Sequence, residues 1–324
     1  MKKKERIWLA AAAALIVLGG IIFGGAMTVL KWDFTKLSAV RYETNRYEMG
    51  ENDGAFENIS ITADTADVLL LPAEGDLCTV ECYEREKVRH TVTVKDGTLT
   101  VEVTDTRKWY EHIGICFGTP RVTVYLPKEM YGMLAVKVAT GGVRIEKGLG
   151  FKSIDVAAST GDVTCHASAD EGIKIKTSTG RIHTEGLTVA SLDLSVTTGG
   201  VTVKDIACAG GVTVKVSTGK ARLTGVTCNS FTSNGNTGEL SLTDVIAVGA
   251  LSVTRSTGDV RLEGCDAAEL YIETDTGDVT GSLLSEKVFI VHTDTGKKEV
   301  PDTIHGGRCK ITTDTGDIKI AVEG

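Results

Sequence analysis

The chain has 324 residues, of which 42% are hydrophobic and 24% are charged, a composition typical of folded rather than disordered proteins. Its formal net charge of −8 at pH 7 argues against a nucleic-acid partner, because nucleic-acid phosphates require basic patches. Only 4 prolines and 5% aromatic residues accompany 37 glycines, and this bias favours strands and tight turns.

The first predicted element is a single transmembrane helix over residues 7–30. This run is apolar throughout, and about 20 such residues suffice to cross a bilayer core. Residues 1–6 are predominantly basic, which predicts a short cytoplasmic tail and an extracytoplasmic remainder in a single-pass protein of the bacterial cell membrane. A cleaved signal peptide is the alternative, because positions 24–26 offer the small residues that a signal peptidase requires.

Two less regular segments follow the helix. Residues 31–55 are polar and mixed, and we expect a linker there. Residues 56–133 are rich in short strand-like runs, and Asp96-Gly97 between TVTV and TLTVEV predicts a β-hairpin. We expect this irregular β prologue to cap the strand edges of the region that follows it.

The remainder of the chain, residues 134–324, is built from one repeat. The dipeptide Thr-Gly recurs at intervals of 19 or 20 residues, and apolar residues stand at alternate positions before and after it. This pattern predicts two strands around each turn, each with one buried face. Its threonines are Thr140, Thr160, Thr179, Thr198, Thr218, Thr237, Thr257, Thr276, Thr295 and Thr315.

A unit of this length cannot bury its own apolar face, whereas stacked units bury a continuous core. Glycine in the turn tolerates the positive φ that a sharp strand-to-strand bend needs. The sequence therefore predicts an all-β fold. It is a single-stranded, β-helix-like β-solenoid of about ten coils behind one N-terminal transmembrane helix.

Five of the eight cysteines lie in the regular repeat and follow its phases, while Cys78 and Cys82 lie four apart on the prologue. Cys165, Cys265 and Cys309 occupy positions where other coils carry aliphatic residues, so we expect them to pack in the core. Cys208 and Cys228 share a phase in consecutive coils, so they could either pack in the core as free thiols or form a disulfide with each other. No CxxC pair or zinc-ligand spacing is present.

Acidic residues accumulate on both sides of the last Thr-Gly turns. Stacked turns would bring these carboxylates near one another, as a calcium site requires, and no other cofactor is expected. The alternative is an ordinary solvated edge, because Lys297 interrupts the row and earlier coils mix both charges. The candidate residues for a divalent cation or a partner are Asp259, Asp275, Asp278, Asp294, Asp314 and Asp317.

The order of motifs is informative in itself. The motifs are, in order, ISITADTADV, DGTLTVEV, VTVYLP and repeated STGDV-like turns. Through these motifs the chain resembles the putative adhesin family of bacterial surface proteins, a domain of unknown function. The resemblance covers roughly residues 59–320. It implies an extracytoplasmic β-solenoid behind a membrane anchor, and it carries no catalytic residues.

The repeat leaves little room for catalysis. No coil departs from 19–20 residues, the six histidines occupy unrelated phases, and no Walker loop or dinucleotide fingerprint is present. We therefore expect no enzyme, but an adhesin or envelope interaction module. The alternatives are the ectodomain of an envelope-stress sensing or signalling complex and, less favoured, a glycan-active enzyme. The last coil, ending at Ile320 and Val322, lacks an evident cap, which predicts end-to-end self-association.

Overall fold

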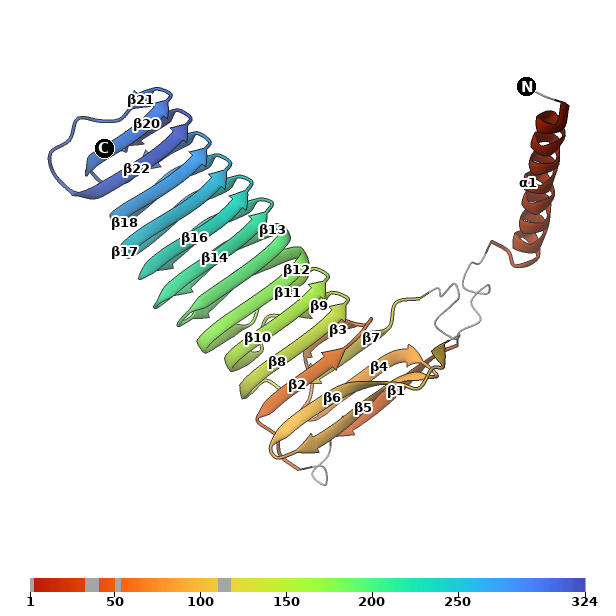
Figure 1. Cartoon of the computed structure of the whole chain (residues 1–324). Coiled ribbons are helices and arrows are strands. Elements are labelled where there is room, and N and C mark those ends of the chain that lie inside the picture. Colours follow the sequence, from red (N-terminus) through yellow and green to blue (C-terminus); the bar gives the residue numbers. More distant parts are fainter. Residues whose placement is uncertain (1–2, 33–40, 50–53, 110–117, 324) are drawn as a thin grey trace.

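The computed structural model describes residues 3–32, 41–49, 54–109 and 118–323. Within them it has one helix, α1 (Lys3–Val29), followed by strands β1 to β23 (Figure 1). The segment Ala11–Val29 is long and apolar enough to cross a membrane, in agreement with the apolar run over residues 7–30. Residues 1–2 of the predicted tail and residues 33–40 and 50–53 of the predicted linker lie outside the described residues.

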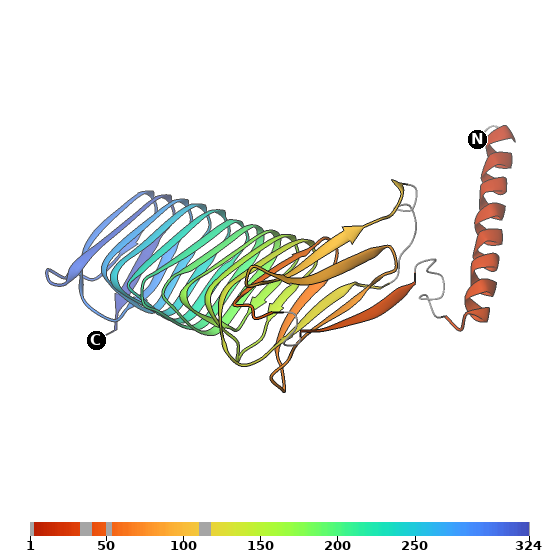
Figure 2. The same ribbon diagram turned by 90° about the horizontal axis from the view of Figure 1, so that it is seen from below.

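The repeats form a solenoid in which each strand pairs in parallel with its equivalent in the neighbouring coil (Figures 1 and 2). The ten Thr-Gly threonines stack in register through the whole rod, which confirms the predicted β-solenoid. Its strands are β8 (Met130–Thr140), β9 (Val143–Ile145), β10 (Gly150–Thr160), β11 (Val163–Cys165), β12 (Ser168–Val189), β13 (Leu192–Cys208), β14 (Gly211–Thr218), β15 (Ala221–Cys228), β16 (Ser230–Thr237), β17 (Leu240–Thr257), β18 (Val260–Thr276), β19 (Val279–Leu283), β20 (Lys287–Thr295), β21 (Lys298–Glu299), β22 (Gly307–Thr315) and β23 (Ile318–Val322).

Each full coil buries side chains from three segments, one more than the sequence pattern predicted. One segment precedes the turn, the second follows it, and the third leads into the next coil. Alternate residues of all three face one common core, as the alternation of strand side chains requires. In the coil around Thr198 these residues are Leu192, Leu194, Val196, Val201, Val203, Ile206 and Cys208.

The Thr-Gly turn requires glycine for two reasons, its backbone conformation and the close approach of the neighbouring coil. Gly219 has a φ of +139°, a value that residues with a Cβ rarely adopt. A Cβ added to Gly219 would also overlap the carbonyl oxygen of Gly199 in the preceding coil. The close stacking of successive turns therefore depends on glycine at this position.

The prologue closes the N-terminal end of the stack. Strands β2 and β3 form a coil directly on β8 and β9, β6 and β7 stack on its other side, and β5 and β4 run antiparallel to β6 and β7. The hairpin predicted at Asp96-Gly97 is confirmed, with Lys95 opposite Thr98. These strands are β2 (Asn58–Ala63), β3 (Asp67–Pro72), β4 (Cys78–Arg85), β5 (Val88–Lys95), β6 (Thr98–Asp105) and β7 (Arg121–Leu126).

Part of the segment expected to be a linker is a strand. Strand β1 (Tyr42–Met49) pairs antiparallel with β4 over its whole length. Tyr47 and Met49 pack against the core, and the Tyr42 ring stacks on Tyr83 with the ring centroids 5.0 Å apart. The prediction failed because polar and charged residues make up most of the strand, so its few apolar side chains do not produce a visible alternation.

The last coils do not stack in the order of the sequence. Strand β22 lies between β18 and β20, and β23 pairs with both β19 and β21 (Figure 1). The C-terminal coil thus fills a slot inside the rod, and the coil of β20 and β21 forms its end. The prediction that the coil ending at Ile320 and Val322 is the exposed last coil is wrong. Every coil has apolar residues at the same positions relative to its turn. The sequence pattern therefore fits either order of stacking equally well.

The solenoid core contains one buried arginine among the described residues. Arg255 is 1% exposed and stands where other coils carry Val196 and Val216. Its Nη2 donates a hydrogen bond to the Ser233 hydroxyl at 2.9 Å, and Gly235 leaves room for the guanidinium. Nε and Nη1 have no hydrogen-bond partner among the described residues. Burial lowers the pKa of Arg255 to about 10.

Candidate functional site

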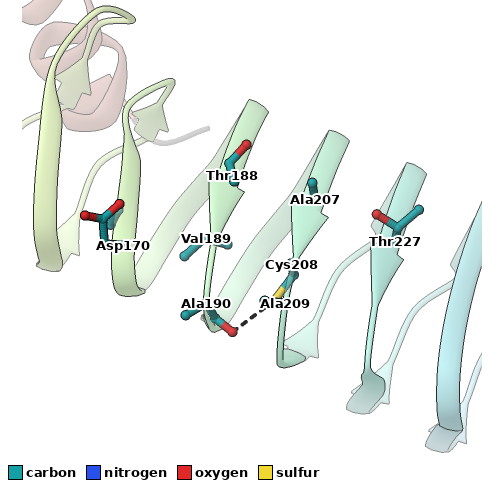
Figure 3. A pocket seen from close by; sticks show the side chains of 9 residues that line it. Asp170, Thr188, Val189, Ala190, Ala207, Cys208, Ala209 and Thr227 are labelled. Carbon is teal, nitrogen blue, oxygen red and sulfur yellow. Dashed lines mark hydrogen bonds between the residues drawn. The ribbon is translucent and has the colours of Figure 1, made fainter.

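Shallow grooves lie on the outer surface of the described coils. One groove of about 380 Å³ crosses consecutive coils on the third side of the solenoid (Figure 3). Ala190, Ala207 and Ala209 line it, and the Cys208 thiol donates to the Ala190 carbonyl oxygen at 3.5 Å. Its remaining titratable side chain is Asp170. Small side chains and a single carboxylate supply contact area but no acid–base pair.

Three of the candidate metal ligands form a ladder along the turn edge. Asp259 Oδ1 accepts a hydrogen bond from the backbone amide of Asp278 at 3.0 Å, and Asp278 Oδ1 accepts one from the amide of Asp317 at 2.8 Å. Asp317 in turn accepts one from the amide of Lys297, which belongs to the end coil. Each carboxylate therefore already binds the backbone of the next coil. The same role accounts for Lys297 at the last position of the row, because no further described coil stacks on the coil that contains it.

The other three candidates, Asp275, Asp294 and Asp314, are exposed on the other side of the turns. Asp294 contacts His292 Nε2 at 2.8 Å. None of the six aspartates belongs to a described group of metal-ligating side chains whose ligand atoms lie within 4.8 Å of one another. The structure thus places them along one edge without gathering them around a point, and the calcium site stays a prediction.

The cysteines behave as core residues. Cys165, Cys265 and Cys309 are buried free thiols at the phases predicted for them. Cys208 and Cys228 are also free and buried, so the structure contains no disulfide between these neighbours. Burial raises the pKa of the Cys228 thiol to about 11, which keeps it protonated and unreactive near neutral pH.

The end of the rod has a different chemistry from the rest of its surface. Strands β20 and β21 have a neighbouring strand on one side only among the described strands, so no strand covers their outer edge. Ile290 is 51% exposed, in a column where the preceding coils carry Lys310, Tyr271 and Ser252. Ile304, in the connection to β22, is 78% exposed. Phe289, Val291 and Val300 are only partly covered.

A group of side chains that the sequence did not reveal lies in the prologue. Cys82 and Glu84 point inward from β4, and His90 points toward them from β5. The signal was available in principle, because Cys82 and Glu84 alternate on one strand and His90 follows a tight connection. Sequence reasoning gave this spacing no weight. The sequence does not show that β4 pairs with β7 while β5 pairs with β6, which is how the three side chains become enclosed.

These features define a β-solenoid repeat protein with one apolar helix before it. The chain belongs to the Toastrack DUF4097 family, which matches residues 56–219 and 209–324. The resemblance drawn from the sequence motifs, to a family of unknown function among bacterial surface proteins, is thereby confirmed. No curated protein matches the chain.

Several solved structures are similar to the chain. A putative adhesin from Parabacteroides merdae shares 14% identity over 76% of this chain and 98% of its own, with a TM-score of 0.49. A putative adhesin from Bacteroides fragilis shares 13% identity over 87% and 97%, with a TM-score of 0.40. A putative lipid binding protein from Parabacteroides distasonis shares 14% identity over 74% and 94%, with a TM-score of 0.45.

Proposed function

We propose that this protein is a membrane-anchored, extracytoplasmic interaction module that binds another envelope or surface component without catalysing a reaction. The observation that carries the proposal is the apolar, half-paired end of the solenoid. Unpaired strand edges and contiguous exposed apolar side chains are normally covered in soluble proteins. Here Val288 and Ile290 are exposed beside such an edge, which favours a partner that covers them.

Helix α1 precedes the prologue at one end of the solenoid, and β20 and β21 form the coil at the other end. The chain leaves α1, enters the prologue and reaches β20 only after the remaining coils have stacked between them. A rod anchored through α1 would therefore present its end coil far from the prologue. The basic residues before the apolar segment Ala11–Val29 support a cytoplasmic N-terminus and an extracytoplasmic solenoid.

The described histidines support a role without catalysis. His292 pairs with Asp294 at the exposed turn edge, and the His166 ring lies edge-on to His183 with 5.7 Å between centroids. His90 is buried with Glu84. None of these three arrangements places a solvent-accessible nucleophile against a histidine backed by an acid, as acyl-transfer chemistry requires.

Site-specific photo-crosslinking in the native membrane tests the proposal. A benzoylphenylalanine replaces Ile290 in the full-length protein, and the matched control carries it at Val248, which is 75% exposed in the middle of the rod. We expect one defined adduct from Ile290 and none at the same yield from Val248. Equal labelling from both positions, or none from either, would refute a binding role for the end coil.

The identity of the adduct separates the forms that this function can take. A cell-wall or host-surface component supports adhesion, whereas a membrane regulator supports the ectodomain of a sensing complex. An adduct with a second copy of the chain supports end-to-end self-association through β20 and β21. Light scattering of the purified protein at high concentration checks the last case, because a strict monomer contradicts it.

A further inference from the structure

The end of the prologue encloses three side chains that are the usual ligands of zinc. Cys82 and Glu84 are 0% and 1% exposed on β4, and His90 is 3% exposed on β5. One thiol sulfur, one carboxylate oxygen and one imidazole nitrogen all lie within 4.8 Å of one another. This is the one such group among the described histidines, cysteines and acidic residues.

Glu84 holds this group together through hydrogen bonds. Its Oε1 accepts a hydrogen bond from Asn45 Nδ2 at 2.6 Å. Its Oε2 accepts one from the His90 backbone amide at 2.6 Å and lies 2.8 Å from His90 Nδ1. Three contacts thus fix the carboxylate, one from Asn45 on β1 and two from His90 on β5. Such preorganisation is what a metal ligand needs, because the ligands then move little on binding.

His90 leaves one of its nitrogens unused. Nε2 is buried and has no hydrogen-bond partner among the described residues. The ring meets Glu84 Oε2 through Nδ1, so an ion shared with Glu84 would take Nδ1 in place of its proton, and Nε2 would carry the remaining proton of the neutral imidazole. The Cys82 thiol is buried beside it, and burial raises the pKa of that thiol to about 12. A purely apolar pocket would favour neither the Cys82 thiol nor the His90 imidazole over an apolar side chain.

We propose that Cys82, Glu84 and His90 bind one Zn²⁺ ion. Thiolate, imidazole and carboxylate are the ligand types that zinc takes in proteins, whereas calcium prefers a shell of oxygens. Binding releases the Cys82 proton to solvent, as is general for thiol ligands. The ion with one thiolate, one carboxylate and one neutral imidazole has no net charge, which suits a buried site.

The position of the site suggests what the ion does. Strand β4 pairs with β7 on one side of the fold and β5 pairs with β6 on the other, and their own pairing is confined to Arg85 and Val88. A zinc ion held by residues of both strands would clamp these two sides together. The ion would therefore hold the N-terminal end of the solenoid closed. It would also raise the stability of the prologue against unfolding.

Metal analysis of the full-length protein tests the proposal. The protein is equilibrated with zinc sulfate, dialysed, and measured by elemental mass spectrometry. We expect about one zinc ion per chain, and at least about a fivefold loss in Cys82→Ser, which removes a ligand at nearly constant volume. The matched control is Cys78→Ser, a buried cysteine of the same strand outside the group, which should retain the zinc.

Cobalt provides a second readout that does not depend on stability. Co²⁺ in place of zinc should give a thiolate-to-metal charge-transfer band in the wild type and in Cys78→Ser, and none in Cys82→Ser. Circular dichroism confirms that each variant is folded. A wild type that binds no zinc, or a folded Cys82→Ser that binds as much as the wild type, would overturn the proposal.

Discussion

Replacing Arg255 with methionine should stabilise the solenoid. The guanidinium is enclosed in an otherwise apolar core, and its single hydrogen bond goes to the neutral Ser233 hydroxyl. Among the described residues, Arg255 forms no ion pair that would compensate its charge. Methionine keeps an unbranched side chain of similar length and adapts its shape to irregular gaps.

The magnitude follows from the cost of burying the charge. Burial lowers the pKa of Arg255 from its usual range to about 10, which corresponds to about 3 kcal/mol against the charged form in the folded state. Against this gain, methionine loses the bond to Ser233 and leaves that buried hydroxyl without a partner, at a cost of about 1–2 kcal/mol. The expected net effect is a stabilisation of about 1–2 kcal/mol.

Urea unfolding of the full-length protein in detergent, followed by the circular dichroism of the strands, measures this difference. The midpoint should rise with no change in slope. The double variant Arg255→Met/Ser233→Ala should gain more, since it also removes the unpaired hydroxyl. Arg261→Met, an exposed arginine six residues on, is the matched control and should shift the stability by less than about 0.5 kcal/mol.

The sign of the pH dependence gives an independent check. The folded pKa lies below the unfolded one, so the penalty is complete up to about pH 10 and declines above it, where the unfolded chain binds more protons. The advantage of Arg255→Met should shrink accordingly above about pH 10. A variant that is less stable than the wild type by about 1 kcal/mol or more would refute the reasoning, because it would mean that the guanidinium is compensated in the core.

Three further predictions concern the turns and the end coil. Gly219→Ala should cost about 3 kcal/mol or more in the same assay, because it combines strain with overlap of the neighbouring turn, while Gly75→Ala in open space should change little. Burial alone would raise the pKa of Asp266, but hydrogen bonds, chiefly from Lys287, lower it overall. Its 2.7 Å ion pair with the buried Lys287 should therefore stabilise the end coil above about pH 4 and be lost as the pH falls through the folded pKa. Asp266→Asn should cost about 3 kcal/mol at pH 7, with a difference in melting temperature that vanishes in acid. Asp278→Ala should cost about 1 kcal/mol and Asp278→Asn less, since asparagine keeps an acceptor for the next amide. A melting temperature that millimolar calcium raises in the wild type but not in Asp278→Asn would instead support the calcium site.

The sequence by itself determined the architecture of the rod. The period of the Thr-Gly turns, the alternation around them and the phases of residues such as Cys165 and Cys309 are local properties, and each agrees with the structure. Glycine at positive φ and apolar residues two apart act within a few residues of one another. They therefore leave their mark in any short stretch of sequence.

The tertiary structure decided which coil touches which and what the side chains bind. Every coil offers the same pairing phase, so nothing local places β22 between β18 and β20 or leaves Ile290 at the end. The aspartates that suggested a cation edge are bound to neighbouring amides, a contact between residues 19 or more positions apart. Cys82, Glu84 and His90 come together where the tight connection from Arg85 to Val88 turns the chain from β4 into β5, and only the surrounding strands bury all three.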